Sequence, residues 1–206
     1  MRRPVCNNCK SNKYLITQDK GFAKARICER CSTVCDKCGG DGIIFKKAET
    51  NYTYANKCDC TMLENRVTVF NDAMIPAQFA LVTLEGFQIS HHSQEEARTN
   101  SQNFVDSYPI QKRGLLFMGP AGVGKTHLAV GIIKKLTLEK GCRCKFVDFF
   151  HLLADIKEGY SAGKSDKEII KPFVKATILL IDELGKGRNN ECEYNILDQI
   201  FSKRYN

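Results

Sequence analysis

From about residue 110 onward, short apolar runs alternate with amphipathic stretches. The apolar runs predict strands at Gly114–Met118, Cys144–Asp148 and Thr177–Ile181. The last run is apolar throughout, so we expect it to be buried on both faces of a sheet. The amphipathic stretches predict helices over 125–139, over 149–159 and from Glu191 to the terminus, where Tyr194, Leu197, Ile200 and Phe201 share one side. Strands that alternate with helices are typical of an α/β fold with a parallel sheet.

Two further helices have recognisable start signals. Ser93 followed by Glu96 predicts a capping box, and Pro109 ends that helix. The positions that fall on its apolar face are Ala97, Ser101, Phe104, Val105 and Tyr108. Ser165 with Glu168 predicts a second capping box, and Pro172 is expected to kink or end the helix that follows.

The cysteines are concentrated near the start of the chain, where eight of eleven lie between Cys6 and Cys60. They form two similar units, each with a tight pair, a loop long enough for a hairpin and a second tight pair. This spacing suits two structural tetrahedral zinc sites, and the alternatives are disulfides, redox pairs or an iron–sulfur cluster. Sequential pairing is favoured over an interleaved arrangement, and it groups Cys6, Cys9, Cys28 and Cys31, then Cys35, Cys38, Cys58 and Cys60.

Charge and hydropathy limit the remaining classes. The formal net charge is +8, and it falls to about +4 if eight thiolates bind two Zn²⁺ ions. A mildly basic chain is compatible with nucleic-acid binding without demonstrating it. No stretch approaches the roughly 18 apolar residues of a membrane span, and the cysteines begin without an apolar signal region. We therefore expect a cytoplasmic protein with no membrane partner.

A phosphate-binding loop follows the predicted strand at Gly114–Met118. It fits the pattern G-x-x-x-x-G-K-[ST], in which main-chain amides wrap phosphates. The lysine of the motif supplies charge to the β- and γ-phosphates, and the threonine hydroxyl ligates Mg²⁺. The residues expected to hold the nucleotide are Gly119, Pro120, Ala121, Gly122, Val123, Gly124, Lys125, Thr126 and His127.

A second nucleotide motif ends the predicted strand Thr177–Ile181. Asp182 and Glu183 follow the apolar run, as in a Walker B sequence. Asp182 is expected to hold the Mg²⁺ shell, and Glu183 to orient and polarise the attacking water as a catalytic residue together with Lys125. The two motifs together predict ATP binding.

In the segments around the two nucleotide motifs, the chain resembles the AAA+ ATPases of the DnaC/IstB type, which are replicative-helicase loaders and transposition helpers. The similar segments are Gly122–Ala129, Ile181–Asn189, Ile75–Phe79 and Thr83–Phe87. The resemblance covers roughly residues 70–206. It implies a P-loop NTPase of AAA+ type, and we divide the chain into a zinc-binding domain at 1–60, a linker and helical segment at 61–110 and a partial ATPase core at 111–206.

The resemblance also implies a function. An ATP-dependent loader would place a replicative DNA helicase on single-stranded DNA, and protomers would assemble through the ATPase domain. The alternative is an IstB-like helper that binds DNA and recruits a transposase. A zinc-dependent nucleic-acid-binding module that only senses nucleotide is a third interpretation.

The chain ends at Asn206, before the sensor strand, arginine finger and lid that the family carries after Walker B. The sheet is therefore expected to be incomplete at the C-terminus. Arg188 and Arg204 do not fall where the family places its arginine finger. We accordingly expect ATP binding more firmly than ATP hydrolysis by this chain.

Overall fold

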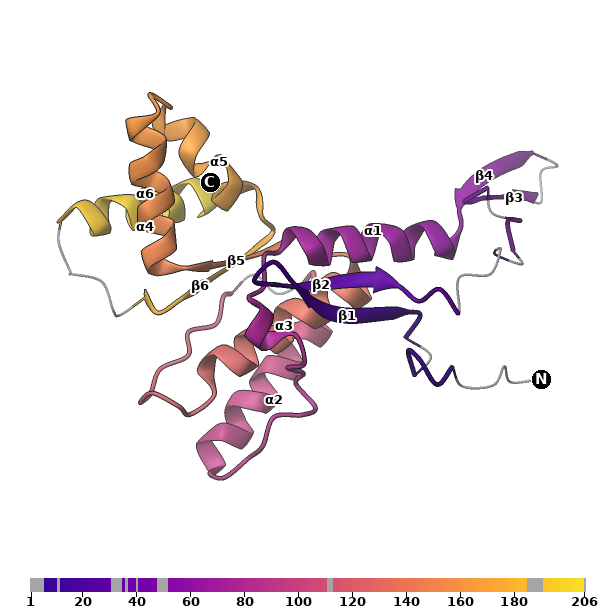
Figure 1. Cartoon of the computed structure of the whole chain (residues 1–206), viewed down its shortest axis with the longest axis horizontal. Helices are drawn as coiled ribbons and strands as arrows, with labels where there is room; N and C mark the ends of the chain where they lie inside the picture. The colour runs from indigo at the N-terminus through magenta and orange to yellow at the C-terminus, as the bar shows by residue number, and fades with distance from the viewer. Residues whose placement is uncertain are drawn as a thin grey trace.

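The computed structural model describes residues 6–10, 12–30, 35, 37–39, 41–47, 52–110, 113–184 and 191–205. Figure 1 shows their arrangement. In chain order the elements are β1 (Tyr14–Asp19), β2 (Phe22–Ile27), β3 (Ile43–Lys47), β4 (Thr53–Lys57), α1 (Asp59–Asp72), the 3-10 helix η1 (Ala77–Phe79), α2 (His92–Ser107), α3 (Lys125–Lys140), β5 (Cys144–Asp148), α4 (Phe149–Ser161), α5 (Asp166–Lys175), β6 (Ile178–Asp182) and α6 (Glu191–Tyr205).

A parallel strand pair lies at the centre of the C-terminal part. β5 and β6 pair in register from Cys144 opposite Ile178 to Asp148 opposite Asp182. The chain returns from one strand to the other through α4 and α5, as parallel pairing requires a crossover. The α/β class and the strand at Cys144–Asp148 are therefore confirmed. β6 begins one residue later than expected and is only half-buried along its length, because β5 is the one strand that pairs with it in the described ranges.

The expected strand at Gly114–Met118 is wrong. These residues form no ladder with any strand of the described chain. Leu116 is 75% exposed and Met118 is 80% exposed. An apolar run becomes a strand only when a neighbouring strand satisfies its backbone N–H and C=O groups, and no such neighbour is present among the described residues.

The expected helices of the C-terminal part are confirmed with small shifts at their ends. α3 begins at Lys125 and stops at Lys140, where Gly141 adopts a left-handed conformation with φ of 65°. α4 begins after Asp148, whose side chain accepts hydrogen bonds from the backbone N–H groups of Phe150 and His151. In α6, Ile196 and Ile200 are buried, whereas Tyr194 and Phe201 are exposed.

The capping box expected at Ser93 and Glu96 is wrong by two residues. α2 begins at His92, and Gln94 Oε1 accepts hydrogen bonds from the backbone N–H groups of Ser90 and His91. A glutamine amide oxygen can accept hydrogen bonds from these unpaired N–H groups, as a glutamate carboxylate does. The helix therefore begins two residues earlier than the serine–glutamate pattern predicts. The apolar face was identified correctly, since Ser101, Phe104 and Val105 are buried.

The capping box at Ser165 and Glu168 is confirmed. Ser165 Oγ accepts from the backbone N–H of Glu168, and Glu168 Oε2 accepts from the backbone N–H of Ser165. Pro172 does not end the helix, because α5 continues to Lys175.

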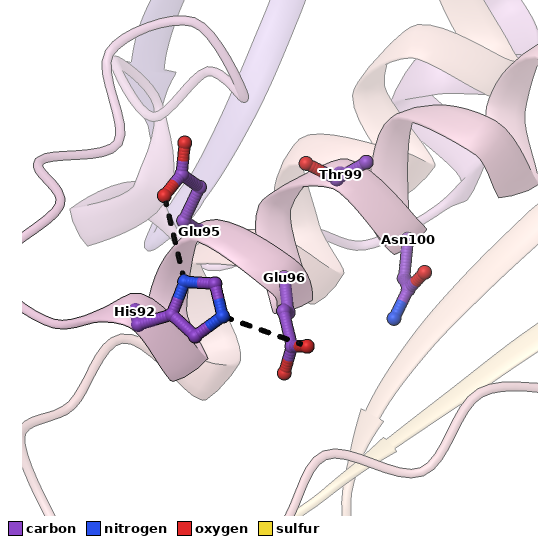
Figure 2. A pocket seen from close by; sticks show the side chains of 5 residues that line it. All are labelled: His92, Glu95, Glu96, Thr99 and Asn100. Atoms are coloured by element: carbon purple, nitrogen blue, oxygen red, sulfur yellow. Dashed lines mark ion pairs between the residues drawn. The ribbon is translucent and has the colours of Figure 1, made fainter.

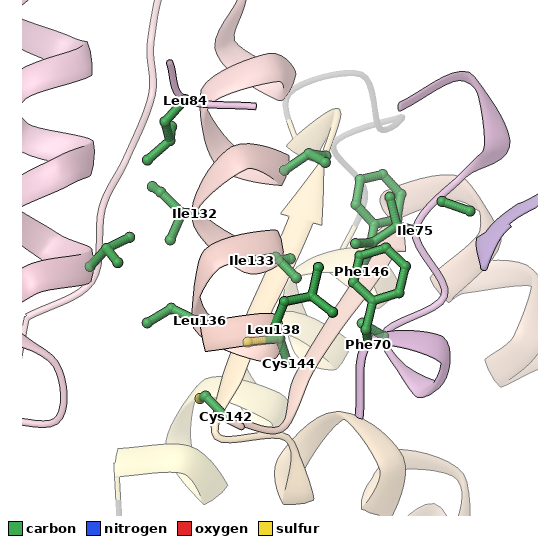
Figure 3. Close-up of a cluster of buried hydrophobic side chains, with 14 of the residues drawn as sticks. Phe70, Ile75, Leu84, Ile132, Ile133, Leu136, Leu138, Cys142, Cys144 and Phe146 are labelled. Atoms are coloured by element: carbon green, nitrogen blue, oxygen red, sulfur yellow. The ribbon is translucent and has the colours of Figure 1, made fainter. Parts of the chain in front are cut away.

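Two hydrophobic clusters hold the described chain together. The larger one joins β2, α1, η1, α2, α3 and β5, and Figure 3 shows its centre, where Phe70, Ile75 and Phe146 meet side chains of α3. The smaller one joins the β5–β6 pair to α4, α5 and α6. β6 contributes side chains to both clusters, so the nucleotide motifs at its end are tied to both halves of the core.

The two cysteine units each contain an antiparallel hairpin, β1–β2 and β3–β4. The first hairpin lies along α1 and joins the larger core. The second stands at the N-terminal end of α1, away from the helices α2 to α6 (Figure 1).

Candidate functional site

The phosphate-binding loop lies between residues 113–118 and α3. Gly119, Gly122 and Gly124 all have positive φ, at 144°, 82° and 92°. Such angles favour glycine and turn successive main-chain N–H groups toward one side of the loop. α3 begins directly after Gly124, so its unpaired N–H groups and its dipole add to the same anion-binding site. The local geometry is that expected from the glycine spacing.

The polar side chains of the two nucleotide motifs meet at this loop. Lys125 Nζ lies over the loop and donates hydrogen bonds to the carbonyls of Gly119 and Pro120, at 2.9 and 2.7 Å. Thr126 Oγ1 donates to Asp182 Oδ1 at 3.0 Å across 56 residues of sequence. The parallel pairing of β5 and β6 thus brings the Walker B aspartate to the start of α3.

A hydroxyl and a carboxylate held this close are an appropriate pair of ligands for Mg²⁺, which prefers oxygen and usually keeps several of its waters. Both oxygens are only partly buried, which leaves room for water and phosphate oxygens to complete the coordination. The residues present therefore fit the metal.

Two other residues of the expected site are placed differently. Glu183 is exposed and adopts φ of 56°, so the chain turns sharply at the end of β6. His127 is directed away from the loop: its Nε2 lies 2.8 Å from the carbonyl oxygen of Thr83, and its ring packs edge-on against Phe87 at 5.2 Å. The side chain of His127 thus anchors the preceding segment in this structure.

The segment before α2 and the first turn of α2 contact the loop from behind, and the sequence patterns did not predict this contact. Phe87 is buried, and a Cβ on Gly124 would overlap the ring of Phe87. Gln94 Nε2 donates to the carbonyl of Val123 at 3.3 Å. The similarity of Thr83–Phe87 to the loader and helper ATPases was the available signal, but it carried no information about contact with the loop.

Replacing Gly124 by alanine is expected to destabilise the fold by about 3 kcal/mol. The new methyl group combines a disfavoured positive φ, costing about 1–2 kcal/mol, with overpacking against Phe87, costing about 1–3 kcal/mol. Urea unfolding of G124A measures the loss. Gly163→Ala is the matched control, because Gly163 has φ of 72° but nothing within 4 Å of the position of a Cβ. Equal losses in the two variants would contradict the packing of Phe87 against the loop.

The cysteine sulfurs converge in two groups at the other end of the molecule. One group contains Cys35, Cys38, Cys58 and Cys60, and the other contains Cys6, Cys9 and Cys28, with all sulfurs of a group within 4.8 Å of one another. The eighth expected ligand, Cys31, lies outside the described residues. The geometry matches the sequential grouping, because neither group mixes cysteines of the two units.

The sulfur separations suit a tetrahedral zinc ion. Zn–S bonds of about 2.3 Å place two sulfurs about 3.8 Å apart, whereas a disulfide brings them to about 2.05 Å. Cys35 and Cys58 are 3.6 Å apart, and Cys38 and Cys60 are 3.5 Å apart. The backbone N–H groups of Lys37 and Cys38 point at the sulfur of Cys35 and lower its pKa to about 7. The donor set thus fits Zn²⁺ and does not fit disulfides.

The two units repeat the same backbone turns. The N–H of Lys10 bonds to the carbonyl of Cys6 as that of Gly39 bonds to Cys35, both at 2.8 Å. Each hairpin is then closed by an equivalent bond, from Cys28 N to Lys13 O and from Cys58 N to Gly42 O. Lys10 and Lys13 hold the positive φ angles that Gly39 and Gly42 hold in the second unit. A lysine adopts such angles at a cost, which supports a common geometric requirement in both units.

A shallow pocket on α2 is a weaker candidate. It is lined by side chains of this one helix: His92, Glu95, Glu96, Thr99 and Asn100 (Figure 2). His92 lies 3.8 Å from Glu95 and 3.9 Å from Glu96, but all three side chains are more than 60% exposed. Exposed ion pairs of this kind contribute little, and we assign the pocket no role.

Two basic residues of the C-terminal part, Lys134 and Arg204, have structural roles. Lys134 is buried and donates to the carbonyl of Ala80 at 2.7 Å, and burial lowers its pKa to about 8. Arg204 donates to the carbonyls of Phe173, Ala176 and Thr177, so it joins the end of α6 to the end of α5. Neither side chain faces the phosphate-binding loop.

No helix among the described residues has the length and apolar character required to cross a bilayer.

Comparison with known proteins shows that residues 65–206 match the family model described as IstB-like ATP binding protein. The chain is 29% identical over 123 residues to the ATP-binding protein of insertion sequence IS5376 from Geobacillus stearothermophilus, covering 60% of this chain and 48% of that protein. It is 24% identical over 136 residues to the replicative helicase loader DnaC of Escherichia coli strain K12, covering 66% of this chain and 55% of the relative.

A crystal structure of the DnaC helicase loader matches with a TM-score of 0.57 and 29% identity, covering 62% of this chain and 72% of that one. The chain spans about half the length of the curated relatives it matches. The β5–β6 sheet and the nucleotide motifs thus fall inside the region matched by the family model, and both cysteine units lie before it.

Proposed function

The chain belongs to the family of IstB-like ATP-binding proteins, and from this premise we propose that it is an ATP-dependent loader of a replicative DNA helicase. The observation that supports its ATP dependence is the hydrogen bond between Thr126 and Asp182, which joins the two nucleotide motifs at the N-terminus of α3. DnaC, a replicative helicase loader, is among the relatives by sequence and by structure.

ATP is the nucleotide that we propose for this site. The amides of residues 119–126 hold the phosphates, and Lys125 moves from the loop carbonyls to the β- and γ-phosphates. When bound, Mg²⁺ neutralises phosphate charge, and Thr126 and Asp182 are its protein ligands. Glu183 is the residue that would orient a water for hydrolysis, and the ATPase domain is the proposed surface for self-association.

The cysteine units are proposed to hold two structural zinc ions. Cys6, Cys9, Cys28 and Cys31 bind one, and Cys35, Cys38, Cys58 and Cys60 bind the other. Each set is a closed donor set of four thiolates, which suits a structural site without an open position. The first zinc unit is attached to the ATPase core through β2 and α1, so zinc there stabilises the domain that binds nucleotide.

Capture of a helicase tests the loader proposal. The zinc-loaded protein, immobilised with ATP and Mg²⁺, is expected to retain the replicative helicase of its host and to bind single-stranded DNA more tightly than duplex at equal salt. The Lys125→Ala protein is expected to retain less helicase, and Lys157→Ala, a change on the exposed face of α4, is the matched control. Failure of the folded wild-type protein to retain the helicase would contradict the proposal.

A transposition helper is the second candidate, and the relative from insertion sequence IS5376 favours it. This function shares the ATP site but needs duplex DNA and a transposase. Preferential binding of duplex over single strands, together with capture of a transposase, would select it over the loader. Both candidates require the same nucleotide geometry.

A further inference from the structure

The hairpin β3–β4 is exposed on both faces. Of its ten residues, only Ile44 and Asn56 are half-buried, and the rest are exposed. Phe45 is 74% exposed, and Tyr54 is 47% exposed. Large aromatic side chains are costly to leave in water, so their exposure on a small, zinc-bound unit calls for a physical reason.

The hairpin of the first unit, β1–β2, packs against α1 and provides a comparison for β3–β4. Ala23 and Ala25 of β2 are buried, and Asn71 of α1 bonds to both the N–H and the carbonyl of Ala25, at 2.7 and 3.0 Å. The N–H of Ala23 also bonds to the carbonyl of Ile75. Small side chains thus fit one face of β2 against α1, whereas strands β3 and β4 bury no side chain against a helix in the part of the chain that the structure describes.

The strand register defines one continuous face of the second hairpin. Phe45 lies opposite Ala55, and the neighbouring pairs on the same face are Ile43 with Lys57 and Lys47 with Thr53. Ala55 is too small to cover the ring of Phe45. Two residues along a strand span about 7 Å, so Lys47 and Lys57 flank the aromatic ring at this spacing on either side.

The charged residues of strands β3 and β4 are all lysines, and Glu49 is the one acidic residue in the sequence that connects them. Lys46, Lys47 and Lys57 lie on the two strands, which carry no acidic residue. On the opposite face, Lys46 is the cross-strand partner of Tyr54. Each face of the hairpin therefore carries an aromatic ring and at least one lysine. An acidic, planar ligand complements this arrangement in both charge and shape.

We propose that the hairpin β3–β4 binds single-stranded nucleic acid, with a base stacked on Phe45 and the flanking phosphates bound by Lys47 and Lys57. Stacking needs an unpaired base, because the faces of bases inside a duplex are already covered. This inference rests on the proposed function, to which it adds a DNA-contacting surface outside the ATPase domain.

Fluorescence anisotropy of a labelled oligothymidine, titrated with the zinc-loaded full chain at several salt concentrations, tests the inference. Phe45→Ala is expected to weaken binding about tenfold, since stacking on one aromatic ring contributes about 1–3 kcal/mol per base. Phe45→Trp is expected to retain the wild-type affinity. The double variant K47A/K57A is expected to reduce the slope of log K against log salt by about 1.4, or about 0.7 per phosphate contact on a single strand.

Matched controls separate the hairpin from exposed residues elsewhere. Tyr205→Ala removes an aromatic side chain that is 90% exposed on α6, and Lys157→Ala removes a lysine on α4; neither should change binding. Unchanged affinity in F45A and in K47A/K57A would overturn the inference, as would absence of binding by the wild type at low salt. Loss of helicase capture with unchanged DNA binding would also overturn it and would identify a protein-docking surface. A wild type that binds DNA through the hairpin but retains no helicase would contradict the proposed loader function alone.

Discussion

Replacing Cys28 by serine is expected to remove one of two zinc ions and to unfold the first cysteine unit. Structural zinc contributes about 10–16 kcal/mol of apparent binding free energy in zinc-finger peptides, which is comparable to the stability of a whole domain. β2 supplies Ala23 and Ala25 to the larger core, so the loss is expected to spread to α1 and to lower the melting temperature of the chain. Atomic emission measures the zinc content, and circular dichroism follows the melting.

The second unit provides the contrast. Cys58→Ser is expected to remove the other zinc ion while leaving the ATPase core folded, because β3 and β4 add no side chain to either hydrophobic cluster. Cys142→Ser is the control for zinc content, since Cys142 is buried beside β5 and belongs to neither sulfur group. Two zinc ions in the C28S protein, or zinc lost equally in C142S, would show that the sulfur groups are not the metal sites.

Replacing Lys125 by alanine is expected to weaken ATP binding on the order of 100-fold, or about 3 kcal/mol. The ammonium group of Lys125 places a positive charge at the loop. Its hydrogen bonds to charged phosphate oxygens contribute about 1.5–3 kcal/mol each. Stability should change little, because Lys125 is half-buried and bonds only to two loop carbonyls in this structure. Isothermal titration with ATP and Mg²⁺ measures the affinity.

Lys157→Ala again serves as the control, because Lys157 is an exposed lysine of α4, which contributes no residue to the nucleotide motifs. Wild-type affinity in the K125A protein would mean that nucleotide binds elsewhere. A K125A protein that is also unfolded would mean that Lys125 acts through the fold, which circular dichroism of the same sample distinguishes.

The parts of the site set by short-range sequence spacing were predictable. The glycines of the phosphate-binding loop act within a few residues of one another, and the two tight cysteine pairs of each unit are joined by one hairpin, so the structure brings both sets together as expected. The partnership of Thr126 with Asp182 was also predictable, because both residues belong to nucleotide motifs whose side chains hold the same Mg²⁺ ion.

The contacts made by residues distant in sequence were not predictable in the same way. Nothing in the spacing of Phe87 or Gln94 shows that they support Gly124 and Val123. The burial of Lys134 was not predictable either, because a lysine is buried only where a specific acceptor, here the carbonyl of Ala80, receives its hydrogen bond. The strand predicted at Gly114–Met118 was wrong, although its apolar run is typical of a strand. A strand also needs a neighbouring strand to complete the ladder, and the local sequence does not specify that neighbour.

A crystal structure of the chain grown with Mg²⁺ and a non-hydrolysable ATP analogue tests the central assignment most directly. We expect triphosphate oxygens within hydrogen-bond distance of the main-chain amides of residues 119–126, and a metal ion between Thr126 Oγ1 and the carboxylate of Asp182. Density for the analogue at any other place, or a loop with Lys125 still bonded to Gly119 and Pro120 in saturating analogue, would contradict it.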